Sequence, residues 1–136
     1  MKALETSVET KGKTTKVKII GYWIVTILLL MCLLTGGITD IMQVQVNKEG
    51  IIHLGFPVYV LTILGVWKIL GAIVIAVPGL LLVKEWAYAG VFFVMSGAFI
   101  SHLVCGDSIG VYIWPLLFAI LTIISWVLRP VTKSLV

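Results

Sequence analysis

Long apolar stretches separated by short polar ones dominate the pattern of this chain. Four of them contain at most one charged residue each, and they run from Ile19 to Met42, Phe56 to Val77, Trp86 to Val104 and Ile109 to Leu128. Each is close to the roughly 20 residues with which a helix crosses about 30 Å of hydrocarbon. Because apolar residues occupy every face and do not alternate with period two, the pattern favours helices over barrel strands. The sequence therefore predicts an all-α integral membrane four-helix bundle.

Prolines and charges mark the ends of these spans. Pro78 and Gly79 follow the second span, and Arg129 and Pro130 follow the fourth, where proline stops a helix. We expect a polar, basic tail at residues 1–18, one membrane domain at residues 19–130 and a short tail at residues 131–136. The first apolar run is longer than the roughly 7–15 residues of a signal peptide and has no A-x-A-like cleavage site, so we expect it to be retained.

Composition and charge support a membrane protein and suggest its orientation. Hydrophobic residues make up 60% of the 136 residues and charged residues 12%, with a mean hydropathy of +1.16, which lies outside the range of soluble domains. Cations gather before the first span, between the second and third, and after the fourth: Lys2, Lys11, Lys13, Lys16, Lys18, Lys84, Arg129 and Lys133. The loops of the opposite side have only Lys48. The positive-inside rule then predicts a multi-pass protein of the cell membrane with both termini cytoplasmic.

The lysine-rich tail at residues 1–18 raises the question of whether the protein binds nucleic acid or the membrane surface. It lacks the interleaved aromatic residues that are typical of nucleic-acid binding, and its charges are spread among Thr, Glu and Ser. We therefore expect no nucleic-acid partner and attribute the tail to attraction toward the membrane surface.

A lysine inside the second span is the main candidate for chemistry. A lysine at the centre of a membrane helix costs about 2.5–3.5 kcal/mol, so Lys68 requires a compensating partner or ligand. Small residues flank it at helical spacing, which favours a position facing another helix. The expected topology places five polar side chains in the outer third of the membrane: Asp40, His53, His102, Cys105 and Asp107. A snorkelling lysine could reach Asp40 or His102, so we predict a polar pocket that opens outward.

Four residues make up the predicted ligand-binding site: Lys68, Asp40, His102 and Asp107. Lys68 would bind an anionic or polar head group, take part in proton transfer, or pair with Asp40 or a backbone carbonyl only to hold the helices together. Instead of binding a ligand, His102 could be a residue at the membrane boundary that is hydrogen-bonded to a neighbour. Asp107 could instead cap the fourth helix.

Small residues on the third span predict close packing there. Gly90, Gly97 and Ser101 recur on one face. Because small side chains let helices approach closely in lipid, we expect this helix to lie at the tightly packed centre of the bundle.

No motif points to a bound metal or to a cofactor. The chain has no nucleotide-binding fingerprint, nucleophile elbow, His-rich motif or EF-hand loop. Cys32 and Cys105 do not form a C-x-x-C pair, and Cys32 should lie roughly 15 Å below the outer rim, where Cys105 is expected. We expect no metal site, no intrinsic cofactor and no redox-active cysteine pair, and these observations leave enzymatic activity open.

Three stretches resemble the DoxX-like membrane proteins: HLGFPVYVLTILGVWKILG, KEWAYAGVFFVMSGAFISHLVCGD and WVLRP. The resemblance covers roughly Ile20 to Pro130 and is most specific at GFPVY, LGVWKILG, KEWAYAG and SH-x-x-x-GD. It implies a four-helix membrane bundle and an association with redox complexes, including thiosulfate:quinone oxidoreductase subunits, or with accessory roles. Relatives often have an aspartate after the FF pair, where this chain has Val94. Six residues of this chain fall at positions that recur in the family, and the resemblance assigns none of them a catalytic role: Lys68, Glu85, Trp86, His102, Gly106 and Asp107.

Two functions fit these observations. In the first, the chain is a membrane redox component that binds a quinone or a similar lipid-soluble carrier, with Lys68 stabilising a carbonyl oxygen or oxyanion and His102 or Asp107 handling protons. A partner subunit would supply the electrons. In the second, the chain is a non-catalytic accessory or assembly protein that packs against another membrane protein or binds a lipid, and its polar cluster is structural. A transporter is disfavoured because no inverted repeat is visible, although a homo-oligomer would relax that limit.

Overall fold

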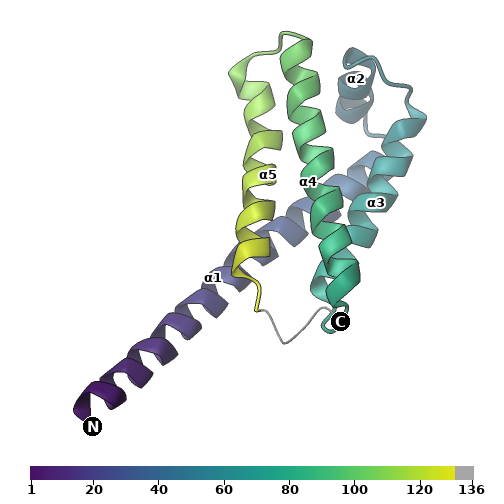
Figure 1. Ribbon diagram of the computed structural model, residues 1–136. Helices are drawn as coiled ribbons and strands as arrows, with labels where there is room; N and C mark the ends of the chain where they lie inside the picture. The colour runs from purple at the N-terminus through teal and green to yellow at the C-terminus, as the bar shows by residue number, and fades with distance from the viewer. Residues whose placement is uncertain (131–136) are drawn as a thin grey trace.

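The computed structural model describes residues 1–130, and in this range the chain forms five α-helices and no strand (Figure 1). The elements are α1 (Lys2–Ile41), α2 (Gln45–His53), α3 (Tyr59–Ala76), α4 (Leu81–Val104) and α5 (Ile109–Leu128). The predicted all-α class is confirmed. The short tail at residues 131–136, with Lys133, lies outside the described residues.

Four of these helices, α1, α3, α4 and α5, are long and apolar enough to cross a membrane. In the bundle α1 packs against α3 and α5, and α4 packs against α5 and α3, so each helix has two neighbours. Figure 1 shows α1 crossing behind the other three, with its N-terminal part projecting away from them. The predicted multi-pass four-helix bundle is therefore present.

Some helix boundaries differ from the prediction. The first helix begins at Lys2 instead of Ile19. No proline precedes Pro57 to interrupt it, and the hydroxyls of the tail threonines donate to carbonyl oxygens four residues back, as Thr10 does to Thr6. The third spanning helix begins at Leu81 and so takes in Lys84, which was expected in a loop. The fourth has the predicted bounds.

The short helix α2 was not predicted. It has nine residues with little apolar character, and only Ile51 on it is buried. A turn with positive φ precedes it at Gln43 (50°), and another follows it at Gly55 (89°), where glycine adopts this conformation at little cost. Both turns reverse the chain, so α2 folds back over the ends of the spanning helices instead of forming an open loop (Figure 1).

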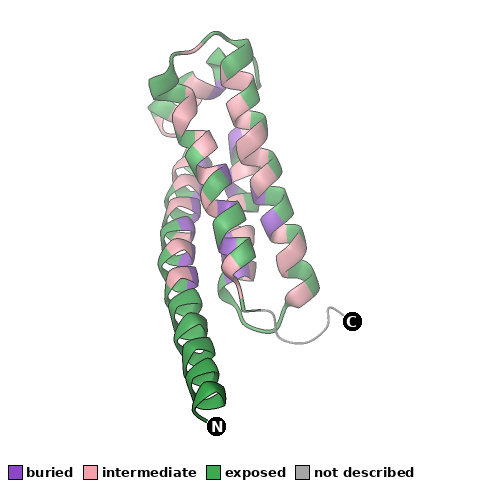
Figure 2. Ribbon diagram, turned by 60° about the vertical axis from the view of Figure 1, so that its left-hand side comes forward, coloured by how far each residue is buried: buried purple, intermediate pink, exposed green. Residues whose placement is uncertain are grey.

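The core of the bundle is small, and its outer surface is apolar. Six buried residues form the core cluster: Leu29, Leu33, Ala72, Ile75, Tyr88 and Val91. Figure 2 shows buried residues on the faces that point inward and an exposed N-terminal part of α1. Large apolar side chains such as Trp67 (60% exposed) and Phe93 (68%) point outward. Exposed apolar area of this extent is expected where lipid covers the protein.

The closest helix contact joins α1 and α3 through two glycines. A Cβ atom on Gly65 would lie 2.7 Å from the carbonyl oxygen of Gly37, and one on Gly37 would lie 2.9 Å from that of Gly65. The two backbones touch there because neither residue has a side chain, and any residue larger than glycine would clash. By contrast, a Cβ on Gly90 or Gly97 of α4 would meet no atom within 4 Å. The prediction that this face of the third span lies at the tightly packed centre is therefore wrong, since the face borders open space.

Hydroxyl groups connect three helices inside the core. Thr26 Oγ1 of α1 lies 2.6 Å from Ser125 Oγ of α5, and Tyr88 Oη of α4 lies 2.8 Å from the same oxygen. All three residues are buried. Hydrogen bonds between membrane helices contribute about 0.6 kcal/mol on average, so this cluster adds modest stability and defines how α1, α4 and α5 are rotated.

We predict that Gly65→Ala destabilises the bundle, whereas Gly97→Ala does not. The added methyl group at Gly65 meets backbone atoms that cannot move aside, and overpacking of this kind costs about 1–3 kcal/mol. The same methyl group at Gly97 has open space. The measurement is the free energy of unfolding of both variants in detergent micelles. Equal stabilities would contradict the observed crossing of α1 and α3.

Candidate functional site

Lys68 of α3 forms an ion pair with Asp40 of α1. Its Nζ lies 2.6 Å from Asp40 Oδ2, and the two side chains are 19% and 7% exposed. Of the two partners that the sequence suggested, the structure selects Asp40. A largely buried pair of this kind offsets the desolvation of both charges, because each is hydrogen-bonded to the other.

The glycines of the α1–α3 crossing make this pair possible. Gly36 and Gly37 lie one turn before Asp40 on α1, and Gly65 lies almost one turn before Lys68 on α3. A Cβ on Gly36 would lie 3.7 Å from the lysine Nζ, which is ordinary van der Waals contact, so the lysine side chain packs directly against this part of α1. The close approach thus brings the two charges together.

The second oxygen of Asp40 is held by α2. Asn47 donates from Nδ2 to Asp40 Oδ1 at 2.8 Å and lies 3.1 Å from Thr39 Oγ1. The carboxylate therefore accepts one bond at each oxygen, from an ammonium and from an amide. The sequence analysis missed Asn47, because its role depends on the fold of α2 over the end of α1.

A second cluster forms around Asp107 in the turn between α4 and α5. His102 Nδ1 lies 2.7 Å from Asp107 Oδ2, and His53 Nε2 lies 2.7 Å from Oδ1. A carboxylate only accepts hydrogen bonds, so each of these ring nitrogens carries the proton. Both bonds hold the pKa of the Asp107 carboxyl below its usual range, with the His102 bond as the largest cause.

This arrangement corrects two expectations. His102 pairs with Asp107 and not with Lys68. The residue at the N-terminal cap of α5 is Ser108, and Asp107 uses both oxygens on histidines instead of capping that helix. His53 was placed in the same outer region by the sequence, but its bond across 54 residues to Asp107 required the fold of α2.

A third polar cluster lies at the opposite ends of α4 and α5. Glu85 forms an ion pair with Arg129, and Trp126 Nε1 donates to Glu85 Oε2 at 2.9 Å. Glu85 is one of the positions carried over by the resemblance. Its contacts join the end of α5 to the start of α4, so its role in this fold is to hold these two helices together.

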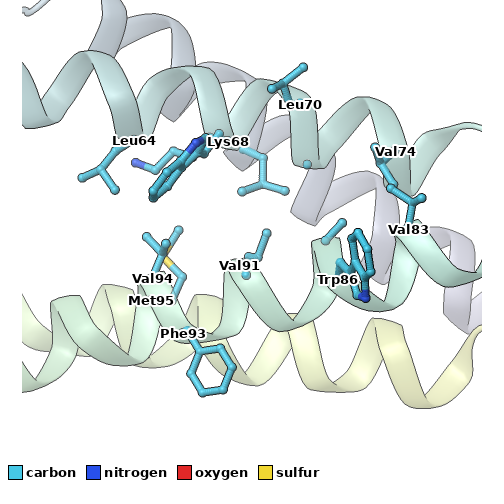
Figure 3. A pocket seen from close by; sticks show the side chains of 15 residues that line it. Leu64, Lys68, Leu70, Val74, Val83, Trp86, Val91, Phe93, Val94 and Met95 are labelled. Atoms are coloured by element: carbon cyan, nitrogen blue, oxygen red, sulfur yellow. The ribbon is translucent and has the colours of Figure 1, made fainter.

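The pocket around Lys68 is apolar and lies between α3 and α4. It is a cleft of about 650 Å³, and Lys68 is the charged residue among those that line it (Figure 3). The cleft extends along the two helices to Val74 and Trp86, near the α3–α4 turn. Val94, where relatives often have an aspartate, is part of its wall.

This cleft is not the polar, outward-opening pocket that the sequence predicted around Lys68. Asp40, His102 and Asp107 do not line the cleft. The physical reason is that these polar groups satisfy one another: Asp40 is covered by Lys68 and Asn47, and Asp107 is occupied by two histidines. The four predicted site residues thus form two separate pairs, Lys68 with Asp40 and His102 with Asp107.

Neither cysteine nor a metal site adds to these clusters. Cys32 and Cys105 are free, and Cys105 Sγ lies 3.9 Å from the carbonyl oxygen of His53. Within residues 1–130 no group of three His, Cys, Asp or Glu side chains has a geometry that could hold a metal ion.

Comparison with known proteins gives one match. A model of the DoxX-like family matches residues 24–125, which is three quarters of the 136 residues. The matched segment contains both candidate pairs and the cleft. No curated protein and no solved structure matches.

We predict that removing one partner of the Lys68–Asp40 pair costs more than removing both. Asp40→Leu leaves a buried ammonium without its counter-ion, which costs about 3–5 kcal/mol, and adding Lys68→Met should recover most of that loss. Unfolding in detergent would measure both. Glu9→Gln is the control, because it breaks the exposed Lys13–Glu9 pair, which contributes less than about 1 kcal/mol. Equal losses in the single and double variants would refute a buried ion pair.

The Asp107 cluster should have a defined pH dependence. Because the pKa of this carboxyl is lowered in the folded protein, its contribution to stability is present above the pKa of an unfolded aspartate, about 3.9, and is lost as the pH falls through the lower folded value. The melting temperature of the wild type should therefore exceed that of Asp107→Asn at pH 6, and the difference should shrink toward pH 3. A difference that is unchanged at pH 3 would contradict the ionised carboxylate.

Proposed function

The chain belongs to the DoxX-like family of multi-pass membrane proteins, and we propose from this premise that it binds a lipid-soluble molecule, a quinone or a membrane lipid, in the α3–α4 cleft. In this proposal it serves as a subunit of a membrane redox system. The observation that carries it is a single ammonium group, Lys68, in the wall of an otherwise apolar cleft.

The size and lining of the cleft suit such a ligand. Its volume of about 650 Å³ lies within the roughly 300–1,000 Å³ of small-molecule sites, which are mostly apolar with a few polar groups that fix orientation. Lys68 would provide that polar group. An ammonium has three N–H donors, and the bond to Asp40 uses one of them, so another can bond to a carbonyl or ester oxygen of the ligand.

The cleft also has a suitable route to the bilayer. Six of its lining residues are exposed: Trp67, Leu70, Val83, Trp86, Gly90 and Phe93. The cleft therefore opens on the surface that faces lipid. A molecule dissolved in the bilayer would move in sideways between α3 and α4, without passing through water.

The redox part of the proposal concerns what Lys68 would do to a bound quinone. A hydrogen bond from an ammonium in an apolar wall stabilises negative charge that develops on a carbonyl oxygen, and it does so more strongly than in water. The sequence has no motif for a flavin, haem or iron–sulfur cluster, so a partner subunit would supply the electrons. His102 and Asp107 do not line the cleft and have no part in this step.

A second candidate function is a non-catalytic accessory or assembly protein. The observation in its favour is the position of the Lys68–Asp40 pair beside the Gly37–Gly65 crossing, where the pair holds α1 against α3 whether or not a ligand is bound. In either case we propose that both termini lie in the cytoplasm of a cell membrane. The start of α1 and the end of α5 lie toward the same end of the bundle, and cations are concentrated there (Figure 1).

We expect a short-chain benzoquinone to bind the purified protein saturably and to quench the fluorescence of Trp67 and Trp86. Gly90→Leu should weaken this binding by roughly tenfold or more, because Gly90 lines the cleft and a Cβ there meets no atom within 4 Å, so the larger side chain takes up space that the ligand needs. Gly97→Leu is the matched control, since Gly97 is equally open but does not line the cleft.

A separate variant tests Lys68 as the hydrogen-bond donor to the ligand. The double variant Lys68→Met with Asp40→Leu removes the ammonium without leaving an unpaired charge, and we expect it to bind the benzoquinone several-fold more weakly. If the wild type and both glycine variants quench alike, the binding proposal fails and the accessory function is favoured.

A further inference from the structure

The helix α2 is attached to the bundle at three points. Asn47 bonds to Asp40 of α1, the buried Ile51 packs inward, and His53 bonds to Asp107 in the α4–α5 turn. The two polar attachments lie six residues apart on one helix, or about 9 Å at 1.5 Å per residue. A short helix does not stretch, so a change at one attachment is passed to the other.

Few contacts hold α2 in place, and a sharp turn bounds it on each side. Ile51 is its single buried residue, at 8% exposure. Gln43 before it and Gly55 after it have positive φ angles, so the chain changes direction sharply at both ends. A segment with so little buried apolar area belongs to the low-stability part of a fold, which opens first.

We propose that α2 is a strap that keeps water from the Lys68–Asp40 pair and thereby regulates the Lys68 site, and that Asn47 is the positioning residue that aims Asp40 at the lysine. This inference rests on the proposed function only for its effect on ligand affinity. The strap itself follows from the contacts of Asn47 and His53.

The physical steps are as follows. With α2 attached, Asn47 holds Asp40 Oδ1 and leaves Oδ2 for the lysine, and the carboxylate is 7% exposed. When α2 detaches, water reaches both oxygens and then the ammonium. A hydrated ammonium must lose water before it can bond to a ligand oxygen, so the affinity of the cleft should fall.

The Asp107 cluster is the other attachment of the strap. Asp107 accepts bonds from His53 of α2 and from His102 of α4, and the latter keeps the carboxylate in position for the former. The other ionisable groups of α2 do not take part: Glu49 accepts a bond from Gln45 of the same helix, and Lys48 forms no ion pair within residues 1–130. Breaking the His53 bond should therefore loosen Asn47 from Asp40 as well.

The test uses the full chain in detergent with three variants: His53→Ala and Asn47→Ala, which each remove one attachment, and Glu49→Gln, which is the control on the same helix. Hydrogen exchange of the α2 amides should become roughly tenfold faster in the two alanine variants, the effect of losing a hydrogen bond to a charged group. Acylation of Lys68 by a water-soluble amine reagent, followed by peptide mass spectrometry, should rise several-fold in the same two. Glu49→Gln should match the wild type in both.

Affinity for the benzoquinone is the third readout. It should fall several-fold in His53→Ala and Asn47→Ala and stay unchanged in Glu49→Gln. Unchanged α2 exchange in folded alanine variants would overturn the strap. Faster exchange with unchanged Lys68 acylation and unchanged affinity would overturn its regulatory role. If neither the wild type nor any variant binds the benzoquinone, the proposed function fails. Hydrogen exchange of α2 and acylation of Lys68 then test by themselves whether α2 acts as a strap.

Discussion

The ion pair between Lys68 and Asp40 is the interaction on which the rest of this structure depends. A single charge inside a bilayer is costly, and each member of this pair removes most of the cost of the other. The pair also requires α1 and α3 to approach until their backbones touch, which they do at Gly37 and Gly65. Charge neutralisation and close helix packing are thus two aspects of one contact.

The packing is looser on the other side of α3. Helices α3 and α4 pack less closely than the neighbouring pairs, and the apolar cleft lies between them. The side chain of Lys68 takes part in both the α1–α3 contact and the cleft: its ammonium group pairs with Asp40, and the side chain also lines the cleft wall. One residue therefore takes part both in holding the bundle together and in the site that we propose for a lipid-soluble ligand. For this reason, the loss of ligand binding in a Lys68 variant is informative only when Asp40 is changed with it.

Polar clusters at both ends of the bundle join its elements to one another. Asp107 and its two histidines attach α2 and the α4–α5 turn to each other, and Glu85 with Arg129 joins the opposite ends of α4 and α5. Between them, the hydroxyls of Thr26, Ser125 and Tyr88 connect three helices in the core. These directional bonds matter because the outer surface of the spanning helices is largely apolar, and in lipid apolar contact alone does not distinguish one helix rotation from another.

Hydropathy and helical spacing were enough to predict the four spans, the all-α class and a Lys68 that faces another helix, with Asp40 as one of two candidate partners, because the cost of exposing backbone or charge to hydrocarbon acts on each segment separately. The cleft, the helix α2 and the pairing of Asp107 with two histidines depend on which segments meet. Asn47 carries no signal in the sequence, and for His53 the sequence indicates the outer region but not the partner, since both contacts form only when α2 folds back across the bundle. The face with Gly90 and Gly97 shows the same limit. Small residues permit close packing, but only the tertiary structure decides that the close contact forms at Gly37 and Gly65 instead, next to the Lys68–Asp40 pair that joins the same two helices.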